Sequence, residues 1–237
     1  MKFLSKIRGK TKPMSRESLL MKFNELINLD KCNDEREALI IGGTNADPEV
    51  EILKKSNWKV TFAGLDVTND FKLDLNHPSE QFEKYDLIVA SQVLEHVHNL
   101  ENAALNFSKL SRKGTRVWIS VPASNFRHGS PEYYSAGYSR EFLKTLFIRH
   151  GFEVISCGEI SNQRIYYFRH ILQLWPSVHQ LHHPVFSYYG IDGSYWEKIL
   201  YNFSHIPTRI VLLISSAKSY ENDDFGIETY GLFMRSE

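Results

Sequence analysis

The sequence has few cysteines, no excess of charge of either sign and no long apolar run. Only Cys32 and Cys157 are present among 237 residues, which is typical of reduced thiols in a cytoplasmic protein. Lysine plus arginine and aspartate plus glutamate number 28 each, so no overall field attracts nucleic acid or an anionic membrane. No apolar run approaches the ~18 residues that cross a bilayer, so we expect no membrane span.

Strand and helix patterns alternate along most of the chain. Apolar runs predict strands within 38–43, 58–67, 71–75, 85–91, 116–122, 152–160 and 227–236. Segments with helical spacing are found at 15–29, 48–57, 93–111 and 139–152, and Asp47 is expected to cap the second of them. Because strands that alternate with helices form parallel sheets, we predict an α/β fold with a doubly wound, mainly parallel, seven-stranded sheet.

The far end of the chain interrupts this alternation with an aromatic-rich, mostly helical stretch. We therefore divide the chain into an N-terminal arm and helix (1–37), an α/β core (38–160), a helical insertion (161–224) and the last strand of the core (225–237). The insertion has three interpretations: a lid over the ligand, an interface of a homodimer, or additional core. Aromatic patches favour interfaces, but the sequence does not choose among the three.

A nucleotide site is expected where the strands end. Gly42 and Gly43 follow the first strand and permit close approach of the backbone to a ligand. Asp66 stands 23 residues after Gly43, where a carboxylate binds both hydroxyls of a ribose. A Gly-Gly turn with a later aspartate also occurs in many α/β proteins, and the G-x-G-x-x-G turn typical of NAD-binding domains is missing.

The motifs ALIIGG, GLD, KLDL, YDLIVASQVLEHV and SRKGTRVWISVP resemble, in order and spacing, class I S-adenosylmethionine-dependent methyltransferases. The resemblance covers residues 38 to about 160 and implies a Rossmann-like methyltransferase fold. It implies S-adenosyl-L-methionine as the cofactor and S-adenosyl-L-homocysteine as the product. The cofactor-binding residues that it implies are Gly42, Gly43, Thr44, Asp66, Val67, Asp74, Leu75, Ser91 and Gln92.

The glycine motif departs from the family pattern at two positions. Ile40 replaces an acid two residues before the first glycine, and Thr44 replaces the second glycine of the motif. The missing acid would normally hold the amino group of the cofactor. A second hypothesis is therefore a non-catalytic binding or assembly module on a methyltransferase fold.

The segment VPASNFRHGSPEYYSAGY resembles a stretch of methyltransferases that are often encoded with surface-saccharide biosynthesis genes. This resemblance implies O-methylation of a sugar or sugar-derived acceptor. His128 is a candidate acid–base group, although it could instead fix the loop; His96 and Tyr134 are the other catalytic candidates. The histidines at 179, 182 and 183 lack accompanying ligands at metal spacing, so we predict no metal site.

Overall fold

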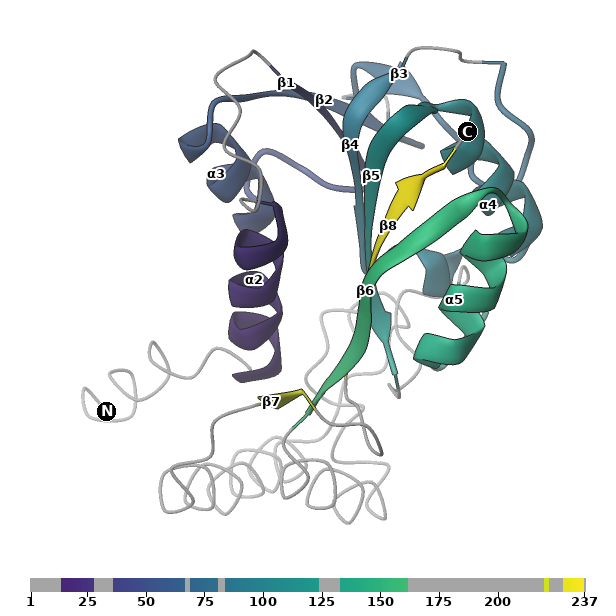
Figure 1. The fold of residues 1–237 in the computed structure, drawn as a ribbon. Coiled ribbons are helices and arrows are strands. Elements are labelled where there is room, and N and C mark those ends of the chain that lie inside the picture. The colour runs from purple at the N-terminus through teal and green to yellow at the C-terminus, as the bar shows by residue number, and fades with distance from the viewer. Residues whose placement is uncertain are drawn as a thin grey trace, which may run out of the picture.

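The structure is a computed structural model that describes residues 14–27, 36–66, 69–80, 84–123, 133–161, 220–221 and 228–236. A single sheet runs through these residues, with helices on both of its faces (Figure 1). The strands are β1 (Arg36–Ile41), β2 (Trp58–Gly64), β3 (Phe71–Lys72), β4 (Tyr85–Ser91), β5 (Ser111–Pro122), β6 (Phe152–Ser161), β7 (Tyr220–Glu221) and β8 (Glu228–Arg235). Most of the predicted arm and insertion lies outside the described residues.

The strand order is β3-β2-β1-β4-β5-β8-β6-β7. The strands from β3 to β5 are parallel, whereas β8 lies antiparallel between β5 and β6. Trp118 of β5 pairs with Leu232 of β8, so the last long strand fills the gap between two strands that precede it in the chain. The predicted fold class is confirmed, with a mixed sheet whose parallel half carries the strand ends expected to form the site.

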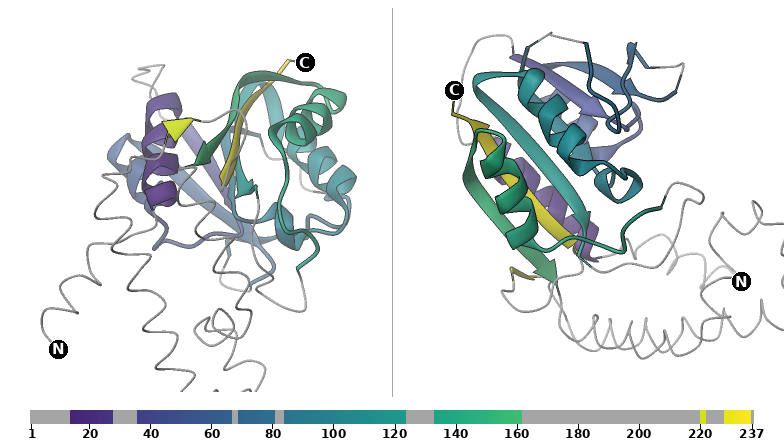
Figure 2. Two further views of the ribbon diagram at one scale, coloured as in Figure 1. Left: turned by 90° about the horizontal axis from the view of Figure 1, so that it is seen from below. Right: turned by 90° about the vertical axis from the view of Figure 1, so that its right-hand side faces the viewer.

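Of the helices in the described ranges, two pack on each face of the sheet (Figure 2). Helices α2 (Met14–Ile27) and α3 (Pro48–Lys55) cover one face, and α4 (Leu100–Lys109) and α5 (Arg140–Arg149) cover the other. Phe23 of α2 packs on Trp118 with ring centroids 5.2 Å apart, and Phe147 of α5 stacks on Phe233 at 4.2 Å. These apolar faces hold the helices in place and leave the strand ends as the open edge. None of the helices within the described ranges is long and apolar enough to cross a membrane.

The predicted helix at 93–111 is wrong at its start. A short 3-10 helix covers Leu94–His96, the chain is extended at Val97, and α4 begins only at Leu100. The side chain of Asn99 caps α4 by accepting from the backbone N–H of Asn102 at 3.1 Å. An asparagine that bonds its own backbone favours a helix start over a helix interior, which explains the break.

Candidate active site

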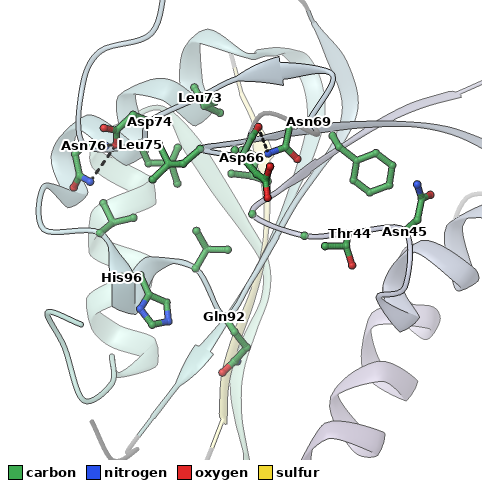
Figure 3. Close-up of a pocket in the computed structure, with 18 residues that line it drawn as sticks. Thr44, Asn45, Asp66, Asn69, Leu73, Asp74, Leu75, Asn76, Gln92 and His96 are labelled. Atoms are coloured by element: carbon green, nitrogen blue, oxygen red, sulfur yellow. Dashed lines mark hydrogen bonds between the residues drawn. The ribbon is translucent and has the colours of Figure 1, made fainter. Parts of the chain in front are cut away.

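A cavity of about 520 Å³ opens at the carboxyl ends of β1, β2 and β4 (Figure 3). Ligands of doubly wound sheets bind in this position, because loops diverge there and leave room between the helices. The residues that line it are Ile41, Gly42, Gly43, Thr44, Asn45, Phe62, Gly64, Leu65, Asp66, Asn69, Leu73, Asp74, Leu75, Asn76, Gln92, Val93, His96 and Val97.

The bend after β1 forms one wall of the cavity. Gly42 has a φ of +70°, a conformation that strains residues with a side chain, and its N–H donates to the carbonyl of Ala63 at 2.8 Å. This bond ties the bend to the end of β2. The backbone of Gly42 and Gly43 is therefore available to a ligand without a side chain in between.

Asp66 lies two residues beyond the end of β2, in a turn that is closed by Asn69. The carbonyl of Asp66 accepts from the backbone N–H of Asn69 at 3.3 Å and from its side-chain amide at 3.0 Å. Asp66 and Asn69 both line the cavity, and the carboxylate of Asp66 is exposed to solvent. A side chain at Gly64 would meet the Asn69 amide at 2.8 Å, so this glycine makes room for the turn.

The segment after β3 forms the opposite end of the cavity. Oδ1 of Asp74 accepts from the backbone N–H of Asn76 at 2.9 Å and from its side-chain amide at 3.1 Å. Oδ1 of Asn76 in turn accepts from the N–H groups of His98 and Asn99, at 2.9 and 3.2 Å. Asp74 is thus held in one orientation by a residue that is itself fixed to the start of α4.

Gln92 follows β4 and adopts a φ of +57°, which is rare for a residue with a long side chain. Its N–H donates to the carbonyl of Ser120 at 2.7 Å, and its side-chain amide donates to Oε2 of Glu228 at 2.9 Å. Such a conformation costs on the order of 1 kcal/mol and persists where its surroundings hold it. These two bonds hold Gln92 at the rim of the cavity.

Glu95, in the LEH motif, was not predicted as a functional residue. Its side chain is fully buried, and neither carboxyl oxygen has a hydrogen-bond partner among the described residues. Burial raises the pKa of this carboxyl to about 7, and the nearby Glu228 carboxylate adds to the shift. The carbonyl of Glu95 accepts from the N–H groups of Tyr134 and Ser135, so the loop before α5 is fixed to this turn.

The predicted site residues fall into three groups. Those that line one cavity are Gly42, Gly43, Thr44, Asp66, Asp74, Leu75, Gln92 and His96. Ser91 and Tyr134 do not line it. The Ser91 hydroxyl is buried and finds no hydrogen-bond partner in the part of the chain that the structure describes, and the half-exposed Tyr134 ring lies 5.3 Å from that of His98. Val67 and His128 lie outside the described residues, and so do the three histidines at 179, 182 and 183.

Three asparagines that line the cavity were missed by the sequence reasoning: Asn45, Asn69 and Asn76. Each of them lies within three residues of a predicted site residue, so proximity in sequence was the available signal. Asparagine is also common in turns for purely local reasons, which hides that signal. In the described part of the chain, no three histidine, cysteine, aspartate or glutamate side chains are arranged to hold a metal ion.

Comparison with known proteins gives one family match and several similar folds. Residues 25–157, more than half of the chain, match the model of a family described as a methyltransferase domain. No curated protein sequence matches the chain.

Three solved structures illustrate the similarity of fold. A candidate sarcosine dimethylglycine methyltransferase from Galdieria sulphuraria aligns over 99% of this chain and 97% of its own, with a TM-score of 0.57 and 10% identity. Coclaurine N-methyltransferase aligns over 92% of this chain and 71% of its own, with a TM-score of 0.52 and 12% identity. Phosphoethanolamine N-methyltransferase 2 from Haemonchus contortus was solved in complex with S-adenosyl-L-methionine. It aligns over 90% of this chain and 51% of its own, with a TM-score of 0.50 and 11% identity. At these identities the likeness shows the fold alone.

Proposed function

The chain belongs to the methyltransferase domain family, and on this basis we propose that it methylates a hydroxyl group of a sugar or sugar-derived acceptor, with S-adenosylmethionine as the cofactor. The observation that carries the proposal is a single cavity bordered by the Gly42–Gly43 bend, the carboxylates of Asp66 and Asp74, and the imidazole of His96. The cofactor supplies an activated methyl group, so the protein mainly fixes distance and angle.

The lining of the cavity fits a nucleoside with an amino acid chain. We assign Asp66 to the ribose hydroxyls and Asp74, with Leu75, to the adenine. This assignment is supported by the fixed orientation of Asp74 and by the buried side chains of Leu73 and Leu75, which offer an apolar surface to a flat base. Gln92 lies at the rim of the cavity, where we expect the methyl group.

A hydroxyl acceptor loses its proton when it is methylated, so a base beside the cavity would accelerate transfer by about 10²–10⁴-fold. His96 lines the cavity, and its ring lies 6.0 Å from that of Tyr133. We propose His96 and His128 as the two candidate bases, and Tyr134 as a residue that shapes the acceptor site. Neutral imidazole is the form that accepts a proton.

The sugar acceptor is supported by the resemblance of the segment around His128, and by the aromatic residues of 161–224, which could stack on sugar faces as a lid. We also propose a cytoplasmic location, on the basis of the low cysteine content and the cofactor. A homodimer formed through 161–224 remains our alternative interpretation of that segment.

The test has two steps. Isothermal titration with S-adenosylmethionine should show binding, and radiolabelled methyl groups should then appear on members of a panel of methyl glycosides. His96→Ala should reduce transfer at least tenfold while cofactor affinity changes little. Binding without transfer to any hydroxyl or amine in the panel would favour the non-catalytic module that Ile40 and Thr44 suggested. An absence of binding at millimolar cofactor would refute the proposal.

A further inference from the structure

The bend beside the cavity has no carboxylate at the position where the family resemblance expects one. Ile40 stands there, and only 4% of its surface is exposed. Its side chain belongs to the apolar core between the sheet and helices α2 and α3. A hydrocarbon cannot balance the charge of an ammonium group, so the amino group of a bound cofactor needs another partner.

Asp47 brings a carboxylate next to Ile40 and Gly43 from a different position in the sequence. A Cβ atom built at Gly43 would lie 2.7 Å from Oδ2 of Asp47 and 2.7 Å from a methyl group of Ile40. The carboxylate and the Ile40 side chain therefore both lie against Gly43, which lines the cavity, whereas Asp47 and Ile40 stand directly behind this lining. The same geometry shows that a residue other than glycine at 43 would displace the carboxylate.

The orientation of Asp47 is not the one that its place in the sequence predicts. Asp47 occupies the N-cap position of α3, where an aspartate usually accepts from the first turn of the helix. It makes no such bond. Its Oδ2 atom instead turns back and accepts from the backbone N–H of Thr44 at 2.7 Å. The predicted N-cap position of Asp47 is confirmed, but its carboxylate is turned away from the helix and held at the bend.

We propose that Asp47 binds the α-ammonium group of the cofactor, taking the role of the acid that is missing at position 40. This inference rests on the proposed function, because it requires the cofactor to lie in the cavity beside Gly43. Oδ2 is fixed by Thr44, which leaves the charge of the group and its second oxygen for a cation. An ion pair of this kind is strengthened by hydrogen bonds that hold the carboxylate in place.

A purely local role for Asp47 is the alternative explanation. The turn from Thr44 to Asp47 also contains a bond from the N–H of Asp47 to the carbonyl of Thr44, at 3.1 Å, and one from the N–H of Ala46 to the Thr44 hydroxyl, at 3.3 Å. Holding this turn requires only a hydrogen-bond acceptor at position 47. Binding an ammonium group requires a negative charge, and this difference separates the two roles.

Asp47→Asn is the decisive variant, because the asparagine carbonyl can still accept from Thr44 while the charge is lost. Two ligands are titrated: S-adenosylhomocysteine, which carries the α-ammonium group, and 5′-methylthioadenosine, which lacks the whole amino acid part. We expect Asp47→Asn to weaken S-adenosylhomocysteine binding about ten- to hundredfold, the range for a bond to a charged group. The affinity for 5′-methylthioadenosine should stay within about twofold of the wild-type value.

Two further variants complete the experiment. Glu51→Gln removes an exposed carboxylate from the first turn of α3, one that pairs with Lys55, and should change neither affinity. Asp47→Ala removes both the charge and the acceptor, and should in addition lower the free energy of unfolding. Equal affinity of wild type and Asp47→Asn for S-adenosylhomocysteine would overturn the inference alone. Failure of the wild-type protein to bind S-adenosylhomocysteine would overturn the proposed function, and this inference with it.

Discussion

Gly42 lies directly against Val93. A Cβ atom added to Gly42 would come within 2.9 Å of one methyl group of Val93 and 3.5 Å of the other. The two residues belong to the loops after β1 and β4, and both line the cavity. The glycine therefore serves two purposes at once: it allows the positive φ of the bend, and it lets the two loops meet.

This contact predicts the cost of filling the bend. Gly42→Ala should lower the free energy of unfolding by about 2 kcal/mol, because it adds a left-handed alanine and an overlap with Val93. In a Val93→Ala background the overlap disappears while the backbone cost remains, so the same substitution should cost about 1 kcal/mol. Urea denaturation of the four proteins measures the difference as a double-mutant cycle. Equal costs in both backgrounds would show that the contact has no energetic weight.

The carboxylate of Asp66 predicts a loss of affinity that is limited to ligands with a ribose. Asp66→Ala should weaken S-adenosylhomocysteine binding about ten- to hundredfold, because two ribose hydroxyls lose a charged acceptor. Unlike the Asp47 variants, it should weaken 5′-methylthioadenosine to the same degree. Asp70→Asn is the matched control, since Asp70 accepts from the Phe62 N–H at 2.7 Å and does not line the cavity. Unchanged affinity in Asp66→Ala would remove the ribose assignment.

Asn106 links α4 to the segment that follows Asp74. It is fully buried; its side chain accepts from the N–H of Ser79 at 2.7 Å and donates to the carbonyl of His77 at 2.8 Å. Asn106→Leu leaves both backbone groups without this partner and should cost about 2 kcal/mol of unfolding free energy. It should also weaken S-adenosylhomocysteine binding. Leu105→Ala, on the more exposed side of α4, should cost less than about 1 kcal/mol; an equal loss would contradict this explanation.

Because the Glu95 carboxyl is buried, we expect the free energy of unfolding to fall as the pH rises from 4.5 to about 7. Its pKa is raised from 4.5 to about 7 by burial, so the native state binds the proton more tightly than the unfolded chain does. The cost is absent below pH 4.5, grows as pH rises through this window and reaches about 3 kcal/mol above pH 7. Glu95→Gln should remove the pH-dependent part of this cost.

Urea denaturation of wild type and Glu95→Gln at several pH values tests the sign of this effect. The variant should gain stability relative to wild type from pH 5 to pH 7.5, and the gap should then become constant. Glu153→Gln changes an exposed glutamate, so its free energy of unfolding should depend on pH as that of the wild type does. A gap that shrinks as pH rises would mean that the native state stabilises the ionised carboxyl.

The core of the fold could be predicted from local pattern. Residues 87–90 form an uninterrupted apolar run, and a run of this kind is buried on both faces of a sheet. The bend at Gly42 and the carboxylate at Asp66 were predicted for the same reason: each lies within two residues of the end of a strand. Features fixed by neighbours in the chain were therefore accessible from the sequence.

Features that depend on residues far away in the sequence could not be predicted from local patterns. The break before α4 is reinforced by Asn76, whose side chain accepts from the N–H groups of His98 and Asn99, more than 20 residues away. Asp47 is a local exception: it is the N-cap residue of α3, as predicted, but its carboxylate accepts from Thr44, only three residues away, and not from the helix. The isolation of the Glu95 carboxyl likewise results from the groups that surround it, which no local motif records.

The place of β8 between β5 and β6 has a consequence for synthesis on the ribosome. Its seven paired positions on β5 and its antiparallel ladder with β6 form only after residue 235 has left the exit tunnel. Until then a nascent chain exposes two unpaired strand borders, each able to recruit another polypeptide. Chaperone protection would therefore matter most before β8 has left the ribosome.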